Sequence, residues 1–288
     1  MRGVRPVTFL SDYGTADEFV GVVHAVIARI APDVRVIDIS HGIPRYGVLQ
    51  GALTLARALP YAPAGVHLAV VDPEVGARRR AVALRTGDED RLLVGPDNGL
   101  LLPAAERFGG IAEVVEISES PWRLEPVAAT FHGRDLFAPV AARLAAGEPL
   151  ADAGPPLEPV ELVPLDVPRA RREPGTLVAT VLGIDGFGNV SLLADHTDLA
   201  AGGLRIGHPV AVTTADGRLE ATYARTFADV EPGDALVYED AARTAAIAVN
   251  RGDAAAALRV RPGDEVTIAA AVEARADAGR ADEAHRAS

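Results

Sequence analysis

The sequence predicts an α/β domain with a largely parallel central sheet, followed by a smaller all-β barrel domain. Strand and helix patterns alternate over roughly the first 150 residues, which is typical of a parallel sheet covered by helices. A proline-rich stretch then interrupts this alternation, and short segments separated by turn residues follow it. The expected limits are 1–155 for the α/β domain, 156–173 for a linker, 174–272 for the barrel and 273–288 for a flexible tail.

In the first domain, short apolar runs predict the strands and longer amphipathic segments predict the helices. Asp17 and Glu18 are expected in the first turn of the first helix, where the helix dipole favours acids. Strands are predicted at 7–10, 34–40, 66–71, 81–86, 91–95 and 113–118, and helices at 17–31, 48–62, 101–109 and 134–147.

In the second domain, the segments are short and alternate between apolar and polar residues, as expected of a barrel or a compact sandwich. Ala215-Asp216-Gly217 between two of them indicates a β-hairpin. Strand-like segments are predicted at 176–185, 208–217, 218–227, 235–240, 244–250 and 265–270.

The composition excludes several classes of function. A formal net charge of −12 gives no general attraction to phosphate backbones, so nucleic acid is not an expected partner. The chain has no cysteine, which excludes disulfides, thiolate metal sites and a cysteine nucleophile and fits a cytoplasmic protein. No apolar run approaches the roughly 18 residues of a membrane span, and the N-terminus lacks a signal-peptide core, so no membrane partner is expected.

Polar residues gather where α/β folds place their ligands. Asp12, Asp72, Asn98 and His132 each follow a predicted strand or precede a predicted helix. Ligands of open α/β sheets bind beyond the carboxyl ends of the strands. These four side chains are therefore candidates for one site.

Each candidate has a structural alternative. Asp72 precedes Arg78-Arg79-Arg80, so it either forms a purely structural ion pair or orients and deprotonates a water molecule. Asp12 is either a turn acid or a carboxylate that accepts hydrogen bonds from a sugar diol. His132 is a lone histidine, and residues of that kind are more often structural than catalytic.

Several common motifs are absent from the sequence. The first strand is not followed by G-x-G-x-x-G, and no G-x-x-x-x-G-K-[ST] or G-x-S-x-G occurs. The seven histidines show no H-x-x-x-H or H-E-x-x-H spacing, so zinc is not expected. The segment D-P-E-V-G could bind a divalent cation, but it lacks a second acidic cluster. We expect neither a metal nor a redox cofactor.

The predicted barrel contains the loop IDGFGNV at 184–190. A simple β-turn accounts for its glycines, whereas an exposed Phe187 beside Asn189 would suit stacking on a nucleobase or binding of an amino-acid headgroup. Phe227 and Asn250 are similar candidates.

Taken together in order, the motifs resemble a known family. They are FLSDYGTADEFVG, VIDISHGIP, VVDPEVGARRR, VGPDNGLL, TFHGRDLFAPVAARLAAG, IDGFGNV and IAVN, and they run from about residue 7 to about residue 272. This order resembles the S-adenosyl-L-methionine (SAM) hydrolases that form adenosine, also called SAM hydroxide adenosyltransferases. Their relatives are the fluorinating and chlorinating enzymes that use the same substrate.

The resemblance implies an N-terminal α/β domain, a C-terminal β-barrel and a homotrimer whose substrate site lies between neighbouring subunits. It assigns handling of the water to Asp72, Arg79 and His132, with Arg79 chosen from the three consecutive arginines. It implies a substrate-binding set of Asp12 at the ribose, Asp17 as a second acid, Asn98, Asp185 and Asn189 at the methionine end, Phe187 and Phe227 as aromatic walls, and Val249 and Asn250 near adenine.

The implied reaction is hydrolysis of SAM by attack of water or hydroxide at the ribose C5′. The sulfonium leaves as a neutral thioether, so the demanding part is to position the water and stabilise its loss of a proton. A carboxylate at Asp72 would repel a halide, which argues against a halogenase. A protein that binds SAM or adenosine without turnover is the other alternative. Glu74 replaces a glycine of the family's turn, and it would be strained if its φ were positive.

Overall fold

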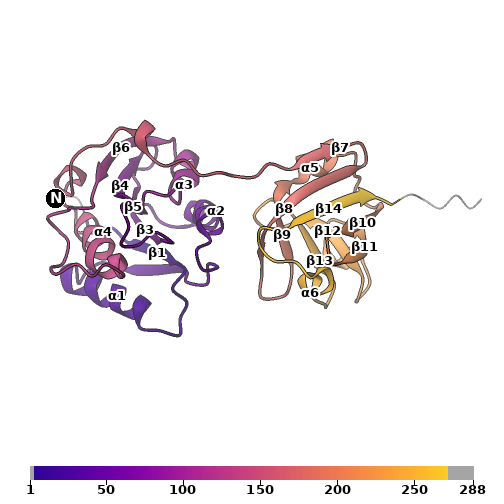
Figure 1. The fold of residues 1–288 in the computed structure, drawn as a ribbon, viewed down its shortest axis with the longest axis horizontal. Helices are drawn as coiled ribbons and strands as arrows, with labels where there is room; N and C mark the ends of the chain where they lie inside the picture. Colours follow the sequence, from indigo (N-terminus) through magenta and orange to yellow (C-terminus); the bar gives the residue numbers. More distant parts are fainter. Residues whose placement is uncertain (1–2, 272–288) are drawn as a thin grey trace, which may run out of the picture. The chain divides into compact units, whose positions relative to one another are not determined.

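The computed structural model describes residues 3–271 and divides between Val167 and Pro168 into two compact units, each with its own sheet and hydrophobic core (Figure 1). The domain limits expected at residues 155 and 174 stay predictions. Within the segment between them, Leu162 is buried in the first unit and β7 (Arg171–Glu173) pairs with the second. The tail expected at 273–288 lies outside the described residues.

The first unit contains a six-stranded sheet in the order β2-β1-β3-β5-β4-β6. β1 is parallel to β2 and β3, and β3 is parallel to β5, whereas β4 is antiparallel to both β5 and β6. All strands except β4 therefore point the same way, which confirms the largely parallel sheet. The strands are β1 (Val7–Ser11), β2 (Val36–Ser40), β3 (Val66–Val70), β4 (Ala81–Thr86), β5 (Leu92–Pro96) and β6 (Ile111–Glu116).

Helices cover both faces of this sheet (Figure 1). Phe9 and Leu68 pack on the side of α1 (Phe19–Ile30) and α4 (Ala138–Ala145). Leu10 and Val71 pack on the side of α2 (Val48–Ala58) and α3 (Leu102–Arg107). Both faces of the central strands are buried, which explains why these strands read as continuous apolar runs.

Two helix starts differ from the prediction. α1 begins at Phe19, so Asp17 and Glu18 precede its first turn and do not lie within it. The predicted helix at 134–147 begins instead as a π-helical turn, η2 (Gly133–Phe137), which continues into α4. This turn follows directly on His132.

The second unit is a closed barrel. Seven strands form a ring because β14 pairs with β10 on one side and with β8 on the other, and β7 adds to the outside of β8. Closure leaves the ring without free strand edges and confirms the predicted barrel. The ring strands are β8 (Thr176–Ile184), β9 (Val190–Asp195), β10 (Pro209–Thr213), β11 (Arg218–Tyr223), β12 (Ala235–Glu239), β13 (Thr244–Val249) and β14 (Glu265–Ala270).

The hairpin predicted at Ala215-Asp216-Gly217 joins β10 to β11, with Thr213 opposite Arg218. The barrel also carries two helices that were not predicted, α5 (His196–Ala201) and α6 (Ala254–Leu258), with Asp195 and Asp253 as N-caps. Both are too short to show a helical period. The 3₁₀ helices are η1 (Leu59–Tyr61), η3 (Leu150–Asp152), η4 (Pro159–Glu161) and η5 (Phe227–Asp229). Within residues 3–271, no helix combines the length and apolar character that crossing a membrane requires.

Candidate active site

Asp72 lies just beyond β3, where the chain leaves the sheet and turns back on itself. The backbone N–H groups of Val75 and Ala77 donate to the carbonyls of Asp72 and Glu74, at 3.3 and 2.9 Å. Gly76 has a φ of +79°, and a Cβ there would lie 2.5 Å from the carbonyl oxygen of Ala129. The turn therefore requires glycine at this position, and it returns the chain so that an arginine can reach Asp72.

Arg79 is the arginine that reaches Asp72. Its Nε donates to both carboxylate oxygens, at 2.9 and 3.0 Å, and its Nη2 also donates to Oδ2. The Asp72 and Arg79 side chains are only 5% and 3% exposed, so solvent screens this pair weakly. The guanidinium also lies 5.3 Å from the centre of the Phe137 ring. Arg80 points elsewhere and donates from Nε to Asp97 at 2.9 Å.

His132 extends this pair into a chain of three side chains. Arg79 Nη2 lies 2.8 Å from His132 Nδ1. Because a guanidinium can only donate, Nδ1 is the acceptor, and the neutral imidazole then carries its proton on Nε2. Partial burial and the Arg79 charge both lower the pKa of His132, against weaker opposing effects of Asp72 and Asp135. The imidazole is therefore neutral near pH 7.

Asp12 lies at the same sheet edge. Its Oδ2 accepts a hydrogen bond from the Tyr46 backbone N–H at 3.1 Å. Partial burial raises the pKa of Asp12, and the negative charge of Asp72 adds to the rise against the opposing backbone hydrogen bonds and Arg45. The two carboxylates are thus electrostatic neighbours. Asp17 is exposed in the turn before α1, and no hydrogen bond or ion pair joins it to the other candidates among residues 3–271.

Tyr13 is a neighbour of the Asp72, Arg79 and His132 side chains that sequence reasoning missed. Its ring packs edge-on against Phe9 and Phe131, with centroids 6.3 and 6.0 Å apart. Burial raises the pKa of Tyr13, as do the charges of Asp12 and Asp72, so the phenol stays protonated. Gly133, next to His132, lies so close that an added Cβ would overlap the Tyr13 hydroxyl. The available signal was the tyrosine immediately after Asp12.

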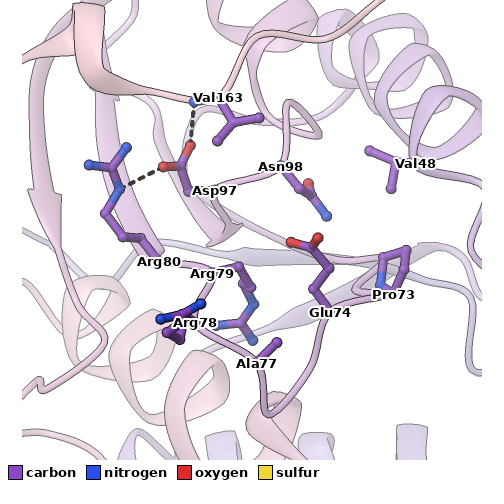
Figure 2. A pocket seen from close by; sticks show the side chains of 10 residues that line it. All are labelled: Val48, Pro73, Glu74, Ala77, Arg78, Arg79, Arg80, Asp97, Asn98 and Val163. Carbon is purple, nitrogen blue, oxygen red and sulfur yellow. Dashed lines mark hydrogen bonds and ion pairs between the residues drawn. The ribbon is translucent and has the colours of Figure 1, made fainter.

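A cavity of about 620 Å³ borders Arg79 (Figure 2). Glu74 and Asn98 also line it, whereas Asp72 and His132 do not. Positive φ in the turn at 73–76 falls on Gly76 and not on Glu74, so the strain considered for Glu74 does not arise. Asn98 Nδ2 donates to the Val71 carbonyl at 2.9 Å, and its Oδ1 accepts from Leu100 N–H at 3.2 Å. The Asn98 amide therefore ties the end of β3 to the turn after β5.

In the barrel unit, Asp185 organises the loop between β8 and β9. Its Oδ1 accepts from the backbone N–H groups of Phe187 and Asn189, both at 2.9 Å, and its Oδ2 accepts from Asn189 Nδ2 at 2.8 Å. These bonds fix the loop and leave the Phe187 side chain 81% exposed. Phe187 is thus a large exposed aromatic on a fixed turn.

Phe227 and Asn250 meet on a neighbouring part of the barrel. Asn250 Nδ2 donates to the carbonyls of Phe227 and Val230, at 3.2 and 2.9 Å. The Phe227 ring packs edge-on against Tyr238, with centroids 5.2 Å apart. Burial raises the pKa of Tyr238, and the charges of Asp240 and Asp185 add to the rise. Sequence reasoning missed this tyrosine. Val249 is partly buried at the end of β13.

The fold and the site define an α/β domain whose strand-end acid, arginine and histidine form one hydrogen-bonded chain, joined in sequence to a β-barrel with an exposed aromatic loop. Two family models match these two parts. Residues 7–154 match the SAM hydroxide adenosyltransferase N-terminal domain, and residues 179–267 match the corresponding C-terminal domain. The chain belongs to the SAM hydroxide adenosyltransferase family.

Individual relatives agree with this assignment. An "(R)-S-adenosyl-L-methionine hydrolase" of Salinispora tropica is 51% identical over 264 residues, covering 92% of this chain and 97% of the relative. A fluorinase of Actinopolyspora mzabensis is more distant, at 29% identity over 92% of this chain and 97% of its own length. A crystal structure titled as an uncharacterized conserved protein from Thermotoga maritima matches with a TM-score of 0.82 at 37% identity, over 91% of this chain and 99% of that one.

Proposed function

We propose that this chain hydrolyses SAM to adenosine and L-methionine by attack of water at the ribose C5′. The observation that carries the proposal is the hydrogen-bonded chain from Asp72 through Arg79 to His132, with contacts of 2.8–3.0 Å from Arg79 Nε and Nη2. The relatives named SAM hydrolase support the choice of substrate and reaction.

In this mechanism the chain of three side chains holds the water in line with the C5′–S bond. The carboxylate of Asp72 keeps lone pairs that Arg79 does not occupy, and it accepts a hydrogen bond from the water. His132 orients the same water through Nε2–H. The water oxygen bonds to C5′, the C–S electron pair leaves on the neutral thioether, and the proton passes through Asp72 to solvent.

The remaining predicted residues bind the substrate in this proposal. Asp12 accepts hydrogen bonds from the ribose hydroxyls, with Asp17 and Asn98 as further polar groups on the α/β unit. On the barrel unit, Asp185 and Asn189 meet the methionine end, Phe187 and Phe227 provide aromatic walls, and the backbone at Val249 and Asn250 holds adenine.

We also propose a cytoplasmic homotrimer, with the substrate between neighbouring subunits. The family resemblance supports the trimer, and the absence of cysteine supports the compartment. Because the relatives' names specify the (R) epimer, we propose that this epimer is the better substrate.

The test is incubation of the purified protein with each SAM epimer, followed by chromatography of adenosine and methionine. Asp72→Asn keeps the shape of the side chain and removes its charge, and we expect it to lower kcat by about 10²–10⁴-fold. Glu113→Gln is a matched control, because Glu113 also pairs with an arginine, Arg85 at 3.2 Å, on the same sheet. Binding of SAM without product, or production only of a halogenated adenosine when halide is added, would contradict hydrolysis.

A further inference from the structure

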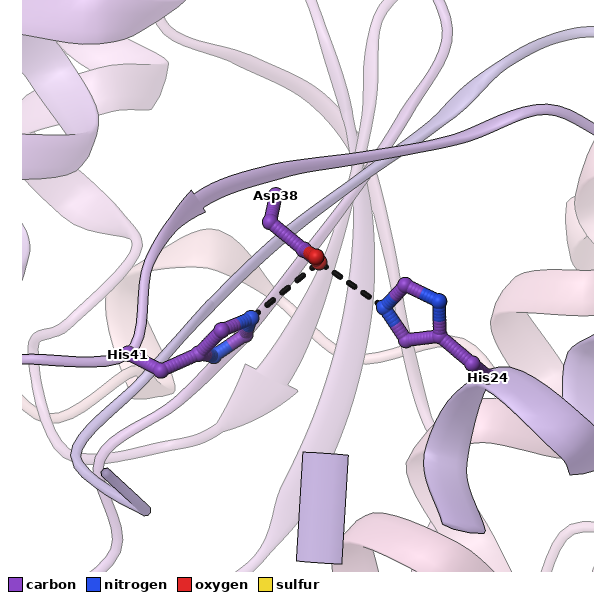
Figure 3. A group of neighbouring side chains, drawn as sticks. All are labelled: His24, Asp38 and His41. Carbon is purple, nitrogen blue, oxygen red and sulfur yellow. Dashed lines mark hydrogen bonds and ion pairs between the residues drawn. The ribbon is translucent and has the colours of Figure 1, made fainter. Parts of the chain in front are cut away.

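Two histidines and one aspartate converge at the outer strand of the first sheet. His24 lies on α1, Asp38 on edge strand β2, and His41 directly after β2. The ring nitrogens of both histidines point at the Asp38 carboxylate (Figure 3). His24 Nε2 lies 2.8 Å and His41 Nε2 3.1 Å from the same oxygen, Asp38 Oδ1. None of the three belongs to the site described above.

The surroundings of His41 orient its ring for ligation. Its Nδ1 lies 2.8 Å from Ser11 Oγ, and its side chain is only 5% exposed. Its Nε2 is buried and, despite its distance from Asp38, makes no hydrogen bond of acceptable geometry. If Nδ1–H donates to Ser11, then Nε2 carries a free lone pair that points into the cluster. Metal-binding histidines are held in this way, with one ring nitrogen on the metal and the other donating to a fixed partner.

The geometry points to a binding site for a divalent first-row transition cation such as Zn²⁺, held by His24 Nε2, His41 Nε2 and a carboxylate oxygen of Asp38. The three ligand atoms lie within 4.8 Å of one another. Zinc–ligand bonds of about 2.0–2.2 Å place tetrahedral ligands about 3.4 Å apart. The present distances from Asp38 Oδ1 to His24 Nε2 and His41 Nε2, 2.8 and 3.1 Å, are slightly shorter than this, so small side-chain rotations would make room for an ion.

The donor set also selects the kind of ion. Two imidazoles and one carboxylate suit zinc and its neighbours, whereas magnesium and calcium prefer oxygen ligands alone. The rings rest on Phe9, which is fully buried and whose centroid lies 4.6 Å from that of His41 and 6.2 Å from that of His24. The side chains of His24 and Asp38 are 35% and 43% exposed, so an ion can enter and keep a water molecule as a fourth ligand.

This site is independent of the proposed hydrolysis, because no step of that reaction uses these residues. The expectation of no zinc rested on the spacing of the histidines, and these three residues do not follow such a spacing. The three ligands come from helix α1, from strand β2 and from the residue directly after β2, so they follow no short motif. Ser11 lies between this cluster and the loop that carries Asp12, because its Oγ contacts His41 and also accepts a hydrogen bond from Tyr13 N–H at 3.3 Å.

Titration of the chelator-treated full-length protein with Co²⁺ and Zn²⁺ tests the inference. Calorimetry should give one saturable site, and Co²⁺ should develop the visible absorption bands of four-coordinate nitrogen and oxygen ligation. His24→Gln and Asp38→Asn each remove one ligand, and we expect a loss of affinity greater than the roughly 10–100-fold that losing a hydrogen-bond partner of a ligand costs. Ser11→Ala, which leaves all three ligands in place, should weaken binding by about 10–100-fold.

His196→Gln is the matched control, because His196 Nδ1 faces Glu239 at 2.8 Å as a single histidine–carboxylate pair in the other unit. It should leave the affinity unchanged. Circular dichroism establishes that each variant is folded before it is titrated. Absence of saturable Co²⁺ and Zn²⁺ binding, or affinity that survives both His24→Gln and Asp38→Asn, would overturn the proposal.

Discussion

His132 shows how one neighbour defines the state of a side chain. Arg79 donates to Nδ1, so a proton on Nδ1 would both break this hydrogen bond and place a second positive charge beside the guanidinium. Asp97 is also paired with an arginine, but its partner Arg80 otherwise contacts Glu161 and, within residues 3–271, reaches no histidine. The three-membered chain therefore distinguishes Asp72 from an ordinary ion-paired aspartate.

The pH dependence of the proposed activity follows from this arrangement. Since burial and Arg79 lower the pKa of His132 from its usual 6.5, the neutral form persists at that pH. We expect kcat/KM to stay level as the pH falls from 8 to about 6.5 and to decline only under more acidic conditions. Rates measured across this range, with His132→Gln as the comparison, check the assignment. A decline centred at or above pH 6.5 would contradict it.

At the scale of elements, Tyr13 and Gly133 join the loop after β1 to the π-helical turn before α4. An added Cβ at Gly133 would overlap the Tyr13 hydroxyl and lie 3.1 Å from its Cζ. Because Tyr13 is packed against other aromatic rings, it cannot move away freely. The small residue after His132 therefore sets how closely the two segments approach.

We expect Gly133→Ala to lower the free energy of unfolding by about 1–3 kcal/mol, as overpacked cores do. Tyr13→Phe removes the overlapping oxygen, so in the double variant part of that loss should return. Gly21→Ala is the control, since Gly21 lies in α1 with no atom within 4 Å of its added Cβ. Urea denaturation of the wild type and of the four variants gives each free energy of unfolding. Equal losses from Gly133→Ala with and without Tyr13→Phe would exclude the contact as the cause.

His67, on strand β3, connects β3 to strand β1 and to the residue before β5. Its Nδ1 lies 2.9 Å from Thr8 Oγ1 on β1, and its Nε2 lies 3.2 Å from Arg91 Nη1, next to β5. Complete burial and the Arg91 charge lower the pKa of His67 to about 3. Arg91 also stacks on the Phe108 ring at 4.3 Å, which keeps its charge beside the histidine.

This lowered pKa predicts a loss of stability in acid. Between pH 6.5 and about 3 the unfolded chain binds a proton at His67 that the folded chain does not. The contribution of His67 is therefore complete above pH 6.5 and falls by up to about 1.4 kcal/mol per pH unit below it. The difference between wild type and His67→Gln in urea denaturation at pH 7, 6 and 5 isolates this term from the carboxylates. A difference that does not change with pH would contradict it.

At the scale of the whole molecule, the proposed trimer gives a direct measurement. Light scattering coupled to size-exclusion chromatography should give three times the chain mass of 29.9 kDa. A monomer at assay concentration would contradict the trimer.

Phe187→Ala is an informative variant, because this exposed aromatic contributes little to packing in the barrel itself. We expect it to raise KM for SAM while the barrel stays folded.

Much of the fold could be predicted from the sequence, because the patterns that indicate it are local. The central strands are buried on both faces and appear as apolar runs, and the barrel strands alternate with turn residues between them. The short helices α5 and α6 could not be predicted, since each depends on an aspartate cap and on contacts within the barrel. The first helix was predicted to start at Asp17, whereas it begins at Phe19, so the two acids precede it.

Apolar periodicity and motifs in a fixed order were enough to predict the fold class, the family and the strand-end position of Asp72. The resemblance already implied Arg79, but its hydrogen bonds to Asp72 and, through Nη2, to His132, 53 residues further along, are seen in the tertiary structure alone. The tertiary structure likewise brought together His24, Asp38 and His41, and placed Tyr13 against Gly133. No local pattern predicts these contacts, because hydrogen bonds and steric contacts act over a few ångströms in space, whatever the separation along the chain.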